Sequence, residues 1–334
     1  MEAQSPQVPA FDPSGVDPES DDTSGAEVET RSLAVSAVAH GQRLDKVLVS
    51  MAPEFSRSHL QSLIAAAHVH VDGAVAGLPS KRLKVGQVVV VALVPTEESL
   101  AFRPEAIGLN ILHEDADLLV IDKPAGLVVH PAPGNWSGTL LNGLLAHHAG
   151  AAHLPRAGIV HRLDKDTSGV MVVGKTLAAV TALTRDIAAR RVHRSYLALA
   201  HGEMLSESLS IEAPIGRDPA SRIKMAVVAS GKPARTDVER LAVQGGVSAV
   251  RCTLHTGRTH QIRVHLSSRG HPLVADAIYG GRPTLSMTRQ ALHAARLSFE
   301  HPTTGRLLDV RAAMPDDLAA AWAQIVGVSG DADD

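Results

Sequence analysis

The spacing of hydrophobic positions predicts two helices and two strands near the start of the chain. Between residues 44 and 51 apolar side chains recur every three or four positions, the period of a helix with one buried face: Leu44, Val47, Leu48 and Met51. Ser56 is suited to cap a second helix, whose apolar positions are Leu60, Leu63 and Ile64. Apolar runs at 68–71 and 88–94 predict two strands. Residues 31–95 are therefore expected to form a small α/β module.

A longer series of elements follows a predicted linker at residues 96–105. Strands are expected at 111–113, 118–121, 157–160, 170–173, 192–200 and 250–254, and helices at 177–187 and from Thr259 to about residue 270. Thr259 is placed to cap the last of these helices. In the strand at 192–200, Leu197 and Leu199 share one face, so Tyr196 points to the other. These elements predict a second domain over residues 106–327.

Composition narrows the class of protein. A chain of 334 residues with 45% hydrophobic residues has room for about two domains with sizeable cores. No apolar run approaches the ~18 residues of a membrane span, and the N-terminus lacks the pattern of a signal peptide. The single cysteine, Cys252, excludes an internal disulfide framework. We therefore expect a cytoplasmic protein with no membrane partner.

The charge of the chain is unevenly distributed. The formal net charge is −3, but eight acidic residues and no Lys or Arg lie in residues 1–30, and residues 328–334 add three more acids. Without these eleven acids, 24 acidic residues face 32 basic ones, so the rest of the chain carries about +8. Such a region can bind phosphates. The two acidic tails, poor in large apolar residues, are expected to be disordered.

One loop, residues 158–169, concentrates charged and turn-forming residues between two apolar runs. The spacing of Asp164, Asp166 and Ser168 matches the start of a calcium loop, but the twelfth position, which should supply a bidentate Glu, is Lys175. A phosphatase nucleophile should end a hydrophobic strand, yet polar residues precede Asp164. The remaining interpretation from the residues alone is a surface turn with solvated charges.

The segment His161 to Gly169 resembles the catalytic motif of the RluA/RluD family of pseudouridine synthases, His-Arg-Leu-Asp-x-x-Thr-Ser/Thr-Gly. The resemblance implies that Asp164 is the catalytic residue and that Arg162 belongs to the loop that contacts RNA. It also implies substrate contacts at Leu163 and Thr167.

Other motifs of the family occur in the expected order between about residues 40 and 325. The run from Lys123 to Pro131 resembles a loop that braces the active site. Arg-Ser-Tyr-Leu-Ala at 194–198 implies that Tyr196 stacks on the target base. The run from Thr256 to Leu266 implies an ion pair between Arg263 and Asp164, and substrate contacts at Arg258 and Gln261. Ala275 replaces a glycine usual in the family, and the segment 281–288 is shorter than in some relatives, which leaves the RNA target open.

The N-terminal module resembles the small RNA-binding module named after ribosomal protein S-four. The resemblance implies that six basic residues contact phosphates without reading the RNA sequence: Arg43, Lys46, Arg57, Lys81, Arg82 and Lys84. Without the resemblance, these residues would be interpreted as solvated charges.

The family resemblance implies an α+β pseudouridine synthase fold, a mixed and mainly antiparallel sheet with flanking helices and a central cleft. The reaction needs no cofactor, and the sequence has no glycine-rich phosphate loop. No metal is expected either, since His260 and His265 are five positions apart and would lie on different helix faces. Arg162 would occupy the space that a flipped uridine vacates.

The implied substrate is RNA: the resemblance favours large-subunit (23S) ribosomal RNA, with tRNA as the alternative. We expect a monomer without an obligate protein partner. Two other classes stay open: a metal-dependent hydrolase, which would need Asp166 and fail with a chelator, and a non-catalytic RNA-binding protein. A pure binder would not need Asp164, Tyr196 and Arg263 each in its own motif.

Overall fold

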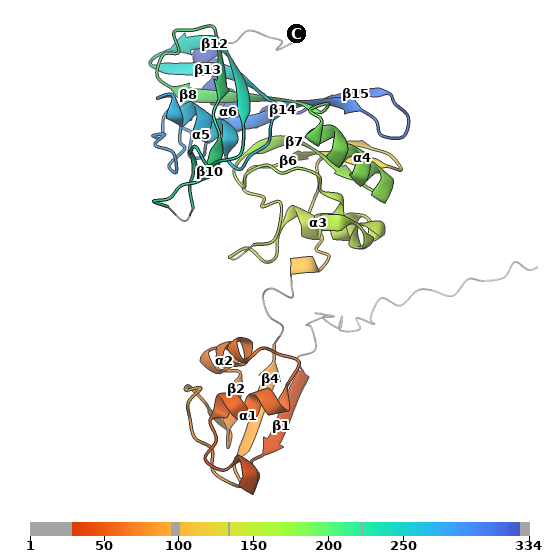
Figure 1. The fold of residues 1–334 in the computed structure, drawn as a ribbon, viewed down its shortest axis with the longest axis vertical. Coiled ribbons are helices and arrows are strands. Elements are labelled where there is room, and N and C mark those ends of the chain that lie inside the picture. Colours follow the sequence, from red (N-terminus) through yellow and green to blue (C-terminus); the bar gives the residue numbers. More distant parts are fainter. Residues whose placement is uncertain (1–28, 95–100, 133, 222, 328–334) are drawn as a thin grey trace, which may run out of the picture. The chain divides into compact units, whose positions relative to one another are not determined.

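The computed structural model describes residues 29–94, 101–132, 134–221 and 223–327 (Figure 1). The chain divides into two compact units, residues 1–96 and 97–334. The predicted tail at 328–334, nearly all of the tail at 1–30, and residues 96–100 of the predicted linker lie outside the described residues.

The first unit is a four-stranded antiparallel sheet with two helices packed on it. Strand order is β1-β4-β2-β3, with bounds Glu29–Ala34, Val88–Leu93, Val69–Val71 and Ala74–Val75. The helices are α1 (Leu44–Met51) and α2 (Arg57–Ala65), and the Ser56 hydroxyl caps α2 by accepting from His59 N–H at 3.2 Å, as predicted. Strand β1 was not predicted, because its largely exposed side chains carry no alternating apolar signal.

The second unit is built on one large sheet of nine described strands. Its order is β5-β6-β7-β14-β8-β13-β12-β9, and β15 pairs with the C-terminal half of β14. Among the described strands of this sheet only β7 and β14 run parallel, so the expected mixed, mainly antiparallel sheet is confirmed. The strands are β5 (Ile111–Glu114), β6 (Leu118–Lys123), β7 (Ser168–Gly174), β8 (His193–His201), β9 (Ser208–Glu212), β12 (Arg235–Gln244), β13 (Val247–Leu254), β14 (Leu292–Glu300) and β15 (Leu307–Arg311).

Helices cover both faces of this sheet (Figure 1). Helices α4 (Leu177–Ala188) and α6 (Asp316–Val326) pack on one face, whose apolar residues include Val120, Val172 and Leu199. Helices α3 (Leu140–His147) and α5 (Gln261–Ser268) pack on the other, against the alternate residues of the same strands. A separate hairpin joins β10 (Ile215–Arg217) to β11 (Met225–Val227). Tyr196 belongs to the face that carries α3 and α5.

Two local predictions are wrong. The apolar run at 157–160 is not a strand, because Pro155–Gly158 forms a short 3-10 turn and only Ile159 bridges to a strand, at Val173. The run is apolar because it is buried under loops and α3, which periodicity alone cannot distinguish from a strand. Thr259 does not cap α5; the residue before the helix is His260, in the left-handed conformation with φ of 56°.

No helix in the described ranges combines the length and the apolar character that a membrane crossing requires.

Candidate active site

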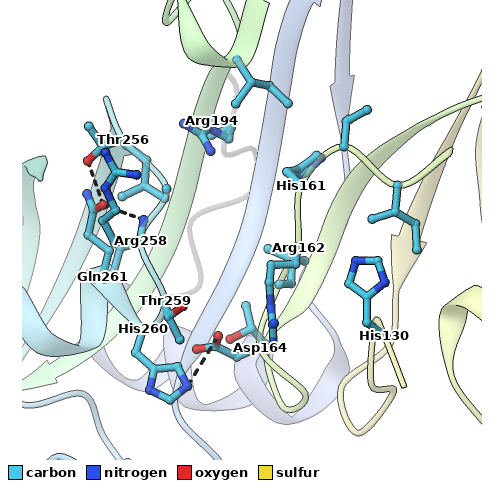
Figure 2. A pocket seen from close by; sticks show the side chains of 18 of the residues that line it. His130, His161, Arg162, Asp164, Arg194, Thr256, Arg258, Thr259, His260 and Gln261 are labelled. Carbon is cyan, nitrogen blue, oxygen red and sulfur yellow. Dashed lines mark hydrogen bonds and ion pairs between the residues drawn. The ribbon is translucent and has the colours of Figure 1, made fainter. Parts of the chain in front are cut away.

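A pocket of about 1010 Å³ opens on the face of the large sheet that carries α5 (Figure 2). The loop with Arg162 and Asp164 lies on one side and the turn from Thr256 to Gln261 on the other. Among the described residues that line it, Asp164 is the single carboxylate. Six arginines line the same pocket: Arg156, Arg162, Arg190, Arg194, Arg258 and Arg263. This excess of positive charge suits a polyanionic substrate.

The loop that carries Asp164 is held from beneath by Lys123. The Lys123 ammonium is fully buried and donates to the carbonyls of Pro124, Leu127 and Lys165 at 2.7, 3.0 and 2.9 Å. Gly126 N–H also donates to the Lys165 carbonyl, at 2.9 Å. Because Lys165 directly follows Asp164, these bonds fix the backbone beside the carboxylate. The scaffold role expected for this motif agrees with the geometry.

Burial lowers the pKa of Lys123 to about 8, although the charges of Asp166 and Asp164 act in the opposite direction. The group thus titrates in the alkaline range, and its three carbonyl partners use all the donors that an ammonium has. This pattern fits an anchor better than an RNA contact.

Gly169 fixes the far end of the same loop. Its φ is 116°, and a Cβ atom there would lie 2.2 Å from the carbonyl oxygen of Ala294 on β14. Only glycine permits both the conformation and the close approach of β7 to its parallel neighbour. The loop therefore enters the sheet at a defined position.

Asp164 belongs to a chain of three charges, of which Arg263 and Asp276 are buried and Asp164 is half-buried. Arg263, 3% exposed, donates from Nη1 to Asp164 Oδ2 at 2.9 Å, which is the ion pair expected from the sequence. Its Nε and Nη2 donate to the two oxygens of Asp276 at 2.7 and 2.9 Å. Burial opposes the charge of Arg263, but the hydrogen bonds and charge of Asp276, together with Asp164, outweigh it and raise the pKa of the guanidinium. Arg263 is therefore a fixed cation beside Asp164.

The sequence reasoning missed Asp276, which is 1% exposed. Its signal was an acidic residue directly after the apolar run Leu273, Val274 and Ala275, a place where a charge is expected only with a partner. The partner, Arg263, lies thirteen residues earlier in the chain.

The second oxygen of Asp164, Oδ1, accepts no hydrogen bond from the described residues. Nε2 of His260 lies 3.8 Å from this oxygen. The Tyr279 hydroxyl accepts from Met225 N–H at 2.9 Å and forms a second hydrogen bond, of 2.8 Å, with His260 Nδ1. Burial lowers the pKa of His260, which favours the neutral imidazole. Oδ1 is thus open to the pocket.

Tyr196 lines the pocket from β8 and is 5% exposed. Burial raises the pKa of its phenol, partly offset by the charge of Arg194, so the hydroxyl keeps its proton at neutral pH. Four apolar side chains complete this wall: Leu163, Leu254, Ile262 and Leu292. An apolar wall with one phenol suits the face and edge of a planar base.

The other predicted substrate residues divide into two groups. Arg162 is exposed at the pocket and has no polar partner among the described residues, and Arg258 lines the pocket while its Nε donates to the Pro233 carbonyl. Leu163 lines the pocket but is 4% exposed and also belongs to the core. These three residues can contact a substrate.

Gln261 and Thr167 are used within the protein instead. The Gln261 amide donates to the Arg235 carbonyl and the Thr236 hydroxyl, while its oxygen accepts from Arg258 N–H and the Thr256 hydroxyl (Figure 2). Both N–H groups and the oxygen of the Gln261 amide therefore form hydrogen bonds that hold the turn before α5. This use of the amide argues against the predicted substrate contact.

Thr167 is 2% exposed, and its hydroxyl accepts from Gln290 Nε2 at 3.3 Å while its N–H donates to the Asp164 carbonyl at 3.1 Å. Although Thr167 borders the pocket, its polar atoms support the loop.

In the first unit, two of the six predicted phosphate contacts are engaged by a buried carboxylate. Arg43 and Arg57 bind Asp45, which is fully buried, at 3.1 and 2.9 Å. The hydrogen bond from Arg43 and that from Arg57 hold the pKa of Asp45 far below its usual range despite its burial. Both arginines remain more than 40% exposed, so each can still face RNA. Of the others, Arg82 donates to the Gly41 carbonyl, Lys46 and Lys84 are exposed, and Lys81 is half-buried.

Among the described residues one cluster has the spacing of metal ligands, Asp115, Asp117 and His301, and it does not line the pocket. His301 Nε2 and Asp115 Oδ2 are 3.0 Å apart, and Asp115 Oδ1 accepts from the N–H groups of Asp117 and Leu118. The cluster therefore has a structural explanation as a turn.

The fold and the pocket define a class of protein: an enzyme that acts on a polyanion through one carboxylate, which an arginine holds in a pocket that a phenol also lines. Comparison with known proteins specifies it. The family model described as RNA pseudouridylate synthase matches residues 117–268, and the S4 domain model matches residues 42–89.

Relatives match along most of the chain. The chain is 48% identical over 313 residues to a "Ribosomal large subunit pseudouridine synthase D" of Neisseria meningitidis serogroup B, covering 90% of this chain and 83% of the relative. A protein of the same name from Nitrosomonas europaea is 47% identical over 299 residues, covering 87% and 86%. The solved structure of human RNA Pseudouridylate Synthase Domain Containing 1 aligns with a TM-score of 0.51 and 30% identity, over 65% of this chain and 89% of that one.

The chain belongs to the RNA pseudouridylate synthase family, is an isomerase of that family, and carries an S4 domain near its N-terminus. The family resemblance noted in the sequence is thereby confirmed.

Proposed function

We propose that this enzyme converts specific uridines of large-subunit ribosomal RNA to pseudouridine, with Asp164 as its catalytic residue. The relatives named above support the class of RNA. The observation that carries the catalytic role is the geometry of Asp164: the single carboxylate among the described pocket residues, with Oδ2 held by Arg263 and Oδ1 open.

The reaction breaks the bond between sugar C1′ and uracil N1 and forms one between C1′ and C5. The C5 proton is lost and N1 gains a proton, so there is no net oxidation. Oδ1 of Asp164 acts at C1′, either as a nucleophile or by stabilising a cationic sugar. Arg263 keeps the carboxylate ionised and aligned. Tyr196 holds the detached base against the apolar wall while it turns.

Access to C1′ requires the uridine to leave its stack. Arg162, exposed beside Asp164, has the planar guanidinium needed to replace the base in the vacated space. The basic residues of the S4 domain add phosphate contacts that position the RNA without reading its sequence. An RNA target is therefore selected largely by its shape.

Pseudouridine mapping of ribosomal RNA tests this proposal. Cells that lack the protein are complemented with the wild type, with Asp164→Asn, or with Asp166→Asn as a matched control in the same loop. We expect specific large-subunit sites to vanish in the deletion and to return with the wild type and Asp166→Asn only. Restoration by Asp164→Asn would remove the catalytic assignment. Loss confined to tRNA sites would change the substrate.

A further inference from the structure

Arg194 is a buried cation without a partner. It lies on β8 two residues before Tyr196, so both side chains point to the same face of the sheet, and both line the pocket. Arg194 is 6% exposed, and its side chain makes no hydrogen bond or ion pair with the described residues; its Nε is buried without a partner. Arg263, equally buried in the same pocket, has two carboxylates. The contrast requires an explanation.

An unpaired charge in a buried place is costly, since its desolvation is not compensated. The described part of the chain offers no counter-ion here, because the one carboxylate among its pocket residues, Asp164, is engaged by Arg263, and Figure 2 shows Arg194 well apart from Asp164. His161 adds no charge at neutral pH, because burial and the charge of Arg194 lower its pKa to about 3. The free enzyme therefore keeps a cation that lacks an anion.

The chain also keeps room for this guanidinium. A Cβ atom on Gly257 would lie 2.8 Å from Nη1 of Arg194. The backbone of Gly257 does not have the positive φ that would by itself call for glycine. A side chain at position 257 would therefore displace the guanidinium of Arg194 from its present place, whereas glycine leaves that place free.

We propose that Arg194 binds a backbone phosphate adjacent to the target uridine, an inference that rests on the proposed function. A phosphate is the anion that every RNA segment entering the pocket carries, and a planar guanidinium binds it through two parallel hydrogen bonds. The carbonyl groups of uracil are neutral and would leave the charge uncompensated. Arg194 then orients the sugar of the flipped nucleotide towards Asp164.

The first test compares Arg194→Met with Arg194→Lys, and with Arg306→Met at the exposed turn between β14 and β15 as a control for lost charge. The probe is an RNA stem-loop with a uridine that the wild-type enzyme converts, bound in an Asp164→Asn background. We expect Arg194→Met to weaken binding about 10–100-fold. The slope of log affinity against log salt should fall by about 0.7–0.9, the value of one phosphate contact. Arg194→Lys should keep the slope.

Stability separates substrate binding from a structural role. Removing an unpaired buried charge should leave the melting temperature of the RNA-free protein unchanged or raise it. A lower melting temperature for Arg194→Met, or binding equal to that of Arg306→Met, would overturn the inference.

The second test identifies the phosphate. A neutral methylphosphonate replaces the linkage on either side of the target uridine. At one of these positions the methylphosphonate should weaken RNA binding by the enzyme that has Arg194, but cause no further loss of binding by the Arg194→Met variant. Additive losses at both positions would refute the pairing of Arg194 with a phosphate. If the wild-type enzyme converts no uridine in any RNA, the proposed function fails by itself; if conversion occurs but the losses are additive, only the inference fails.

Discussion

Replacing Asp276 with asparagine tests whether this carboxylate positions Arg263 and, through it, Asp164. Both oxygens of Asp276 accept from Arg263, at 2.7 and 2.9 Å, in a site where Asp276 is 1% exposed. Asparagine has nearly the same shape, but it is neutral and its amide nitrogen accepts no hydrogen bond. One of the two charge-assisted bonds is lost, and Asp164 remains as the charged partner of the guanidinium.

We expect the free energy of unfolding to fall by about 3 kcal/mol. Removing one partner of a buried ion pair costs about 3–5 kcal/mol, and asparagine retains one acceptor. For a unit of this size the change lowers the melting temperature by about 6–12 °C. The control is Asp309→Asn, whose partner Arg296 is 45% exposed. Breaking that surface pair should cost about 1 kcal/mol or less.

Activity is measured as tritium released from RNA labelled at uracil C5, at a temperature where both variants are folded. Asp276→Asn should lower kcat by about 10–100-fold with little change in KM, because a shift of about 1 Å in a catalytic group has effects of this size. An Asp276→Asn enzyme with wild-type kcat would refute the positioning role. A free energy of unfolding equal to that of Asp309→Asn would refute the energetic reasoning.

Three further predictions follow from groups beside Asp164. Lys123→Met should lower the free energy of unfolding in urea by about 2–4 kcal/mol and reduce kcat, because three carbonyls lose their donor. As the pH falls from 6.5 to 4, the free energy of unfolding of the wild type should decrease more steeply than that of His161→Gln, by up to about 1.4 kcal/mol per pH unit. The reason is that the imidazole takes up a proton in the unfolded chain but not in the folded one, where its pKa is lowered to about 3. Equal pH dependence of the two free energies, measured by urea titration, would contradict this. Asp166→Asn, assayed with and without a chelator, should keep wild-type activity, whereas loss in either case would favour a metal-dependent mechanism.

Much of the local structure could be predicted from the sequence because it depends on neighbours. Helical spacing located α1 and α4, the Ser56 cap was placed correctly, and alternation put Tyr196 on the face opposite the leucines. The error at residues 157–160 shows the limit of this reasoning. A short apolar run reports burial, but the partner that buries it decides whether it becomes a strand or a turn.

The site residues show a similar division. Three motifs contained Asp164, Tyr196 and Arg263, and the structure brings all three to one pocket although 99 residues separate Asp164 from Arg263. Residue type and motif order therefore specified which groups meet. They could not specify how each polar atom is used, which is why Gln261 and Thr167 were assigned to the substrate although their polar atoms bond within the protein.

The sequence by itself indicated the division into two units, several of the helices and strands, and three residues of the pocket, because periodicity, caps and motifs depend on residues close to one another in the chain. Tertiary structure alone decided the pairing of charges. Asp276 neutralises Arg263 from a separate loop, while Arg194 is buried in the same pocket and forms no ion pair with any carboxylate of the described residues. Hydrogen bonds and ion pairs act over a few ångströms between segments far apart in the chain, and only the folded backbone sets those distances.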